Sequence, residues 1–198
     1  LPGSFDVSKA SGWTGGTVSG NTLKVDADKG FVTYQYDCGK EQSVTFKLQY
    51  TKAVQKYDLY VDGEQFTSEK LSIACGEGTA SYAPDTKTLT LNNATITKGG
   101  KSDENPKYGI RVVGDTDLTI KLSGTNSITL ANGGGIFADG SSDNYNIIGD
   151  GKLTIDVKWD ALYTLNGNIS ITEGAELDIK SAEGNGIMSY NKGNISID

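Results

Sequence analysis

The chain has 198 residues, a formal net charge of −7, no histidine and two cysteines. Because the acidic residues are spread without blocks and no basic cluster accompanies them, composition argues against nucleic acid and anionic lipid as partners. No run of about 18 apolar residues occurs, which excludes membrane insertion through a spanning helix, and the lack of histidine removes the commonest general base and metal ligand.

Residues 1–54 carry three short stretches of alternating apolar and polar residues, which predict strands at residues 23–26, 31–37 and 43–50. A turn is expected at residues 37–40. These strands are too few for a complete β-sandwich, so we expect a small antiparallel meander. It either caps the first coil of the following domain or is the end of an upstream module.

A second domain is expected from residue 55 to residue 198. Residues 57–63 predict a strand that ends in a glycine turn, and residues 88–96 predict the strands with which a regular repeat begins. Pro84 suits the start of a coil, because proline cannot donate a hydrogen bond in the middle of a sheet. Residues 98–107 contain glycine, serine, asparagine and proline, and they predict a longer projecting loop.

The strongest pattern in the chain is a repeat of about 26 residues that contains three alternating segments. The apolar anchors of its first segment in successive copies are Ile110, Ile136, Leu162 and Ile187. A second apolar run follows each anchor, and a third follows in the three complete copies, such as residues 118–120 and 128–130 after the first. A fixed period without a helical pattern predicts stacked coils, and parallel connections are almost always right-handed. The expected fold class is therefore all-β, a right-handed parallel β-helix with three strands per coil.

The chain ends at Asp198, after the second strand of a coil. An unfinished coil leaves open strand edges and an exposed core, which solenoids normally cap. We therefore expect either that the protein continues beyond this point or that this end packs on another surface.

One outer face of the predicted solenoid differs from the other two. The second and third strands direct mostly serine, threonine, asparagine and aspartate outward, whereas the first strand directs large and apolar side chains outward. The candidate ligand-binding residues on this face are Arg111, Phe137, Asp139, Tyr163, Met188 and Tyr190. Coils stack about 4.8 Å apart, so Phe137 and Tyr163 are expected side by side. An apolar outer face needs a partner, and aromatic rings suit the stacking of a sugar.

Three kinds of cover for this face stay open: the N-terminal meander, the loop at residues 98–107 and a neighbouring subunit. With any of them, the face is an internal or oligomeric contact rather than a ligand platform. A glycine before an anchor can also shift the alternation by one residue, which would exchange the inward and outward sets.

Catalysis is not expected. Parallel β-helices include pectate lyases, which use an arginine base beside calcium-binding carboxylates, and polygalacturonases, which use aspartates with a histidine. This chain has a single arginine, Arg111, and no histidine. Asp139, Asp143, Asp150 and Asp160 can in principle supply an acid–base pair, but their turn sequences are typical of aspartates that shape the backbone. No catalytic residue, metal ligand or cofactor is predicted, apart from a weak indication of Ca²⁺ in these acidic turns.

Cys38 and Cys75 fit no metal-binding spacing. If the protein is exported, a disulfide bond between them would close a long loop and stabilise the fold by about 3–4 kcal/mol. The alternative is a pair of unrelated thiols, one of which is buried.

Residues 57–63 and 78–94, with the Gly-Ile, Leu-Thr-Ile and Asn-Ile-Ser-Ile units that follow them, resemble repeat proteins on the surface of Gram-positive gut anaerobes. The resemblance implies a secreted or cell-surface bacterial domain that is adhesin-like or carbohydrate-binding, with a glycan or another surface protein as its partner. The leading hypothesis is therefore a non-catalytic exported module for adhesion or carbohydrate binding. The alternatives are a polysaccharide-degrading β-helix enzyme similar to pectin lyases and a purely structural stalk.

Overall fold

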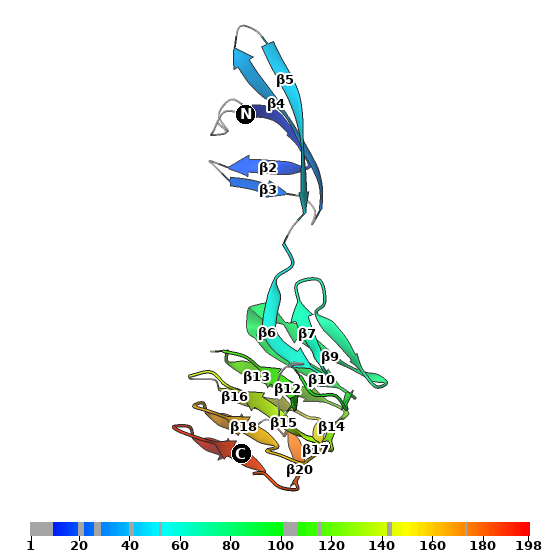
Figure 1. The fold of residues 1–198 in the computed structure, drawn as a ribbon, viewed down its shortest axis with the longest axis vertical. Coiled ribbons are helices and arrows are strands. Elements are labelled where there is room, and N and C mark those ends of the chain that lie inside the picture. The colour runs from blue at the N-terminus through cyan, green and yellow to red at the C-terminus, as the bar shows by residue number, and fades with distance from the viewer. Residues whose placement is uncertain are drawn as a thin grey trace. The chain divides into compact units, whose positions relative to one another are not determined.

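The computed structural model describes residues 10–19, 22–25, 29–39, 42–51, 53–100, 107–114, 116–141, 144–172 and 174–198. The chain divides into two compact units, residues 1–53 and residues 54–198 (Figure 1). Strands dominate both units. The described residues contain no α-helix, and their one helical element is the 3₁₀ turn Pro84–Thr86.

Unit 1 is built from antiparallel strands. They are β1 (Ala10–Thr14), β2 (Gly16–Ser19), β3 (Thr22–Val25), β4 (Lys29–Gly39) and β5 (Gln42–Thr51). β4 lies between β1 and β5 in one sheet, and β2 pairs with β3 in a hairpin. Trp13 stacks on Tyr34 with 4.7 Å between the ring centroids. The three predicted strands are present in the described residues, although β4 continues to Gly39, over the first three residues of the predicted turn.

Unit 2 contains stacked coils whose strands form three sheets (Figure 1). The first-strand sheet contains β12 (Lys107–Val112), β15 (Gly133–Ala138), β18 (Leu162–Thr164) and β21 (Ile187–Ser189). The second-strand sheet contains β10 (Thr88–Asn92), β13 (Leu118–Ser123), β16 (Tyr145–Gly149), β19 (Ile169–Ile171) and β22 (Ile195–Ile197). The third-strand sheet contains β11 (Thr95–Ile96), β14 (Thr125–Leu130), β17 (Lys152–Val157) and β20 (Glu176–Ser181).

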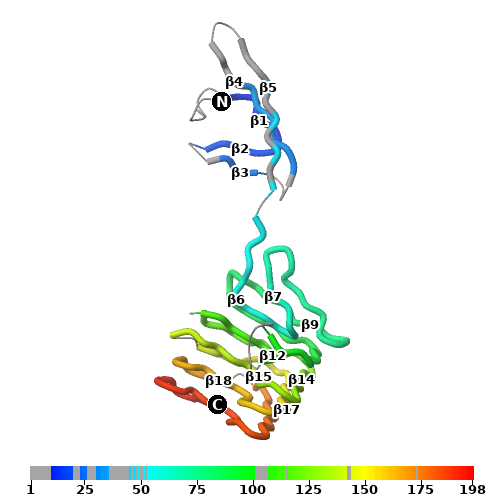
Figure 2. Tube along the Cα trace, in the orientation of Figure 1, coloured from blue at the N-terminus to red at the C-terminus, as the bar shows by residue number. Residues whose placement is uncertain are grey.

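Each of these strands pairs in parallel with the equivalent strand of the next coil. Figure 2 shows the coils following one another in chain order, from green through yellow to red. The predicted parallel β-helix with three strands per coil is therefore confirmed.

The predicted register is confirmed as well. The four anchors of the first strand pair with one another coil after coil, and Ile120 pairs with Ile147, which pairs with Ile171. These side chains join one continuous core, in which Ile110, Ile120 and Ile136 are 0 % exposed. A one-residue shift of the alternation is excluded, because it would place these isoleucines in solvent.

An asparagine ladder joins successive coils at the turn before the second strand. Oδ1 of Asp117 accepts hydrogen bonds from the backbone N–H and Nδ2 of Asn144, at 3.0 and 2.8 Å. Oδ1 of Asn144 accepts in the same way from Asn168, at 3.1 and 2.8 Å, and Oδ1 of Asn168 accepts the Asn194 N–H at 2.8 Å. Each turn thus fixes the next one, which explains why asparagine or aspartate recurs at this position of the repeat.

Two antiparallel hairpins cover the N-terminal end of the coils. β6 (Lys56–Val61) and β7 (Glu64–Thr67) extend the first-strand sheet beyond β12, and β8 (Ser72–Cys75) and β9 (Gly78–Ala83) extend the second-strand sheet beyond β10. Their inward residues Leu59, Phe66 and Ile73 are buried in the core of the coils. Residues 56–83 therefore form a cap, and the parallel coils begin at β10 rather than at residue 55. Alternation marks a strand without giving its direction, so the sequence pattern does not separate cap from coil.

The last strands β20, β21 and β22 are the outermost members of their sheets. Ile195 and Ile197, which are equivalent to buried residues of earlier coils, are 46 % and 64 % exposed. In the last described coil these two side chains are therefore open to solvent.

Candidate functional site

The first-strand sheet brings the predicted platform residues into one outward column. Arg111 pairs with Phe137, Phe137 with Tyr163, and Tyr163 with Met188 in consecutive coils. Tyr60 of the cap strand β6 pairs with Arg111 and extends the column at its N-terminal end. These five residues are referred to below as the ring column.

Both faces of the Phe137 ring are occupied within the ring column. The guanidinium of Arg111 lies 4.3 Å from the ring centroid, and the Tyr163 ring stacks at 4.8 Å with 9° between the two planes. Arg111 belongs to the preceding coil and Tyr163 to the following one, so they approach Phe137 from opposite sides. Tyr108 adds a tilted contact at 4.7 Å. A sugar that stacks on an aromatic residue needs an open ring face, and Phe137 offers solvent only its edges.

Arg111 is held by groups on its own sheet and is only 4 % exposed. Its Nη2 donates to Asp139 in an ion pair, and its Nη1 donates to the carbonyl of Val112. The other oxygen of Asp139 accepts the Gly114 N–H at 2.8 Å. Burial raises the pKa of Asp139, whereas the hydrogen bonds from Arg111 and Gly114 and the charge of Arg111 lower it. The lowering effects together are larger, so the pKa of Asp139 lies below its ordinary value of 3.8. Asp139 therefore acts as the structural counter-ion of Arg111.

The described part of the predicted covering loop lies against Arg111. The Gly100 N–H donates to the carbonyl of Tyr108 at 2.6 Å, and a Cβ at Gly100 would lie 2.8 Å from the Cβ of Arg111. This close approach explains the burial of the arginine stem. Residues 101–106 lie outside the described residues, so wider cover of the face by this loop stays a prediction.

The C-terminal members of the predicted site are more accessible. Tyr163 and Met188 are half-buried, and Tyr190 is 60 % exposed. Burial, together with the neighbouring Asp160 and Tyr190, raises the pKa of Tyr163. Asn185 Nδ2 lies 3.0 Å from the Met188 sulfur. The six predicted platform residues thus share one side of the solenoid, but Tyr190 is the one among them that is largely open to solvent.

The aspartates considered for acid–base catalysis serve hydrogen bonds between coils or lie in turns. Oδ1 of Asp160 accepts both the backbone N–H and Nδ2 of Asn185, at 2.8 Å each, and Asp139 holds the arginine described above. Asp150 is exposed in the turn before β17, and Asp143 lies outside the described residues. Across the described part of the chain, no three cysteine, aspartate or glutamate side chains gather in a metal-binding arrangement.

Cys75 is a free thiol in β8 and is fully buried. Burial, and after it the nearby charge of Asp62, raises the pKa of this thiol to about 11, so the reactive thiolate is scarcely populated at neutral pH. The side chain of Cys38 lies outside the described side chains, and the disulfide bond considered between the two cysteines is not formed at Cys75 in this structure.

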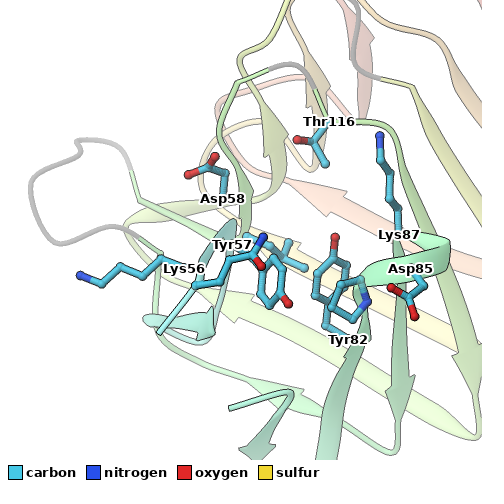
Figure 3. A pocket seen from close by; sticks show the side chains of 10 residues that line it. Lys56, Tyr57, Asp58, Tyr82, Asp85, Lys87 and Thr116 are labelled. Atoms are coloured by element: carbon cyan, nitrogen blue, oxygen red, sulfur yellow. The ribbon is translucent and has the colours of Figure 1, made fainter. Parts of the chain in front are cut away.

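Unit 2 also contains a pocket that the sequence pattern does not indicate. Its volume is about 400 Å³, within the range of small-molecule sites. It lies where β6 and β9 of the cap meet the start of β10 and the connection between β12 and β13 (Figure 3). The lining residues are Gln55, Lys56, Tyr57, Asp58, Leu59, Tyr82, Pro84, Asp85, Lys87 and Thr116. It is referred to below as the tyrosine pocket.

Two tyrosines form the aromatic wall of the tyrosine pocket. The rings of Tyr57 and Tyr82 meet edge to face, with 5.4 Å between centroids and 69° between planes. Tyr82 packs on the buried Phe66 at 5.6 Å and is itself 8 % exposed. Burial, and after it Tyr57, raises the pKa of Tyr82, so its hydroxyl stays protonated at neutral pH. The wall is therefore supported from behind by the core of the cap.

Charged side chains of both signs line the remainder of the tyrosine pocket. Lys56 and Asp58 lie on β6, and Asp85 and Lys87 lie at the turn before β10. All four are exposed, and within the described part of the chain none of them forms an ion pair. The two tyrosines of the wall lie on different cap strands, Tyr57 on β6 and Tyr82 on β9. Their pairing becomes visible only once the hairpins are folded.

No protein-family model matches the sequence, and neither the curated proteins nor the solved structures give a match. No helix among the described residues is long and apolar enough to cross a membrane. The functional conclusion therefore depends on the geometry of the chain itself.

Proposed function

We propose that the chain is a non-catalytic module of a secreted or cell-surface bacterial protein, and that its solenoid unit binds carbohydrate. The observation that carries the proposal is the tyrosine pocket, which combines an aromatic wall with hydroxyl, carboxylate and ammonium groups. A pyranose presents an apolar C–H face and a rim of hydroxyl groups. Aromatic rings complement the apolar C–H face. A few well-placed polar groups bind the hydroxyl groups and so fix the orientation of the sugar.

The tyrosine pocket supports binding better than the ring column does. Phe137 has both ring faces in contact with Arg111 and Tyr163, so it offers little area for stacking. The accessible end of the face, Tyr190 with the half-buried Met188, is the second candidate surface for a glycan or for another surface protein.

The absence of catalysis is the other half of the proposal, and the chemistry of the carboxylates supports it. A glycosidase needs one carboxyl with a raised pKa as general acid beside a second that stays ionised. The pKa of Asp139 is lowered, and Asp160 is occupied by two hydrogen bonds from Asn185. These groups are suited to hold the coils together rather than to transfer protons.

A titration of the full chain with neutral and acidic mono- and oligosaccharides, followed by calorimetry, tests the proposal. Tyr57→Leu keeps apolar bulk but removes the more exposed ring of the wall, and we expect it to weaken binding at least about tenfold. Tyr190→Ala is the matched control on the other face and should leave the affinity unchanged. The same mixtures should develop no new reducing ends and no unsaturated products.

Failure of every sugar to bind, or wild-type affinity in Tyr57→Leu, would overturn the pocket as a carbohydrate site. Loss of binding in Tyr190→Ala with wild-type binding in Tyr57→Leu would assign the site to the accessible end of the first-strand face, at Tyr190 and Met188. Turnover that disappears in Asp139→Asn or Asp160→Asn would instead support the alternative of a polysaccharide-degrading enzyme.

A further inference from the structure

Tyr82 carries a polar group that the described part of the chain does not use. The residue is 8 % exposed, and its ring packs on Phe66 at 5.6 Å and on Tyr57 at 5.4 Å. Its backbone is fixed as well, because its N–H donates to the carbonyl of Leu71 at 2.9 Å. Among the described residues, however, the Tyr82 hydroxyl has no hydrogen-bond partner. The hydroxyl of a buried tyrosine normally has one, so this hydroxyl indicates a partner other than these residues.

The same hydroxyl faces the tyrosine pocket. In Figure 3 it is directed toward the side of the pocket where Thr116 lies. The raised pKa of Tyr82 keeps the hydroxyl protonated at neutral pH, so it can donate one hydrogen bond and accept another. A phenylalanine would make the same ring contacts with Phe66 and Tyr57. Packing therefore accounts for the ring of Tyr82 but not for its hydroxyl, whereas a polar ligand in the pocket accounts for both.

The charged side chains of the pocket balance one another locally. Lys56 and Asp58 are two residues apart on β6 and so lie on the same face of that strand. Asp85 and Lys87 are two residues apart at the turn before β10. Figure 3 shows the first pair on one side of the two tyrosines and the second pair on the other side. A charged group on a ligand would therefore meet a like charge as well as an opposite one on either side.

We infer that the tyrosine pocket takes an uncharged pyranose and that one hydroxyl of this sugar is hydrogen-bonded to the hydroxyl of Tyr82, an inference that rests on the proposed carbohydrate-binding function. The apolar face of the sugar packs on Tyr57, the more exposed ring of the wall. Its other hydroxyl groups donate to the aspartates and accept from the lysines, in charge-assisted hydrogen bonds that need no charge on the sugar. Tyr82 then determines specificity, because a site that hydrogen-bonds a hydroxyl discriminates against an analogue without it.

Calorimetry with methyl glucoside, methyl galactoside and methyl mannoside identifies the preferred neutral sugar, and the monodeoxy derivatives of that sugar then test the contact. Tyr82→Phe keeps the ring and removes only the hydroxyl, and we expect it to bind the preferred sugar about five- to tenfold more weakly. One deoxy sugar should bind the wild type and Tyr82→Phe equally, because it lacks the group that Tyr82 contacts. Tyr60→Phe, a matched loss of a hydroxyl from β6 outside the pocket, should change no affinity.

Urea unfolding of Tyr82→Phe distinguishes a ligand-binding hydroxyl from a structural one. The midpoint should stay unchanged or rise, and a lower midpoint would show that the chain itself uses the hydroxyl and would overturn the inference. Wild-type affinity in Tyr82→Phe, or an equal loss for every deoxy sugar, would overturn it as well. So would glucuronate or glucosamine binding at least about tenfold more tightly than the preferred neutral sugar. Each of these results leaves carbohydrate binding intact, whereas failure of every sugar to bind would overturn both the inference and the proposed function.

Discussion

We expect Phe137 of the ring column to contribute measurably to the stability of unit 2, because its ring contacts Arg111 of the preceding coil and Tyr163 of the following coil. Phe137→Ala removes a half-buried ring, and the lost burial is worth about 1 kcal/mol, roughly half the value of a fully buried side chain. It also removes the stack on Tyr163 at 4.8 Å, worth about 0.5–1.5 kcal/mol. The contact with the Arg111 guanidinium at 4.3 Å is worth about 0.5–1 kcal/mol. Together these losses predict a destabilisation of unit 2 by about 2–3.5 kcal/mol.

The two tryptophans allow unit 2 to be followed separately in the full chain. Trp13 belongs to unit 1 and Trp159 to unit 2, so a Trp13→Phe background leaves Trp159 fluorescence as the reporter of solenoid unfolding in urea. Phe137→Leu, which retains apolar bulk without the ring, should lose less than Phe137→Ala. Tyr190→Ala, at a position that is 60 % exposed, should change the free energy of unfolding by less than about 0.5 kcal/mol.

A double-mutant cycle with Tyr163→Ala isolates the ring–ring contact from general burial. We expect a coupling energy of about 0.5–1.5 kcal/mol between Phe137 and Tyr163. A loss below about 0.5 kcal/mol in Phe137→Ala, or additive effects in the cycle, would refute a structural role for the ring column. The data would then favour the interpretation of Phe137 and Tyr163 as an exposed ligand-binding surface.

Three further predictions concern the core, the acid stability and the thiol. Ile120→Asp should destabilise unit 2 by several kcal/mol, roughly the cost of a buried unpaired charge, because Ile120 is 0 % exposed; an equally stable variant in urea would contradict the register. Since the pKa of Asp139 is lower in the folded chain than its ordinary 3.8, its stabilisation is present at neutral pH and is lost as the pH falls from about 4 through the folded pKa. Asp139→Asn should therefore flatten this acid limb in thermal unfolding, and an unchanged limb would argue against the pairing with Arg111. Cys75, with a pKa of about 11, should react with a thiol reagent only after unfolding, so rapid labelling of the native chain at this position would be inconsistent with its burial.

The coils of this protein are predictable from sequence, because the repeat gives the number of residues per coil and also shows which side chains point toward the core. Ile110 and Ile136 recur at equal spacing and alternate with outward residues, so the pattern determines strand pairing, register and core together. The same logic places Phe137 beside Tyr163. The repeat does not predict how the two rings are oriented, because their orientation depends on the side chains of the preceding and following coils. It also does not predict the ion pair between Asp139 and Arg111.

The cap and its pocket are less predictable, since they do not repeat. The strand that contains Tyr57 alternates like any coil strand, and only its antiparallel pairing with β7 and β12 distinguishes it. Tyr82 lies far from Tyr57 in the sequence, and nothing in either local pattern indicates that their rings will meet. Nonlocal pairing of this kind is set by topology, which propensity and alternation do not specify.

This difference also bears on where a parallel solenoid can bind a small molecule. In the repeating part, equivalent side chains stand about one strand spacing apart, so aromatic rings such as Phe137 and Tyr163 turn their faces to each other and use them for coil stacking. An open ring face and a concave surface arise where the repeat is interrupted. In unit 2 that interruption is the junction of the antiparallel cap with the first coil, where Tyr57 and Tyr82 line the tyrosine pocket. The non-repeating residues of this junction, rather than the regular face that first attracts notice in the sequence, are therefore the ones on which recognition of a ligand is expected to depend.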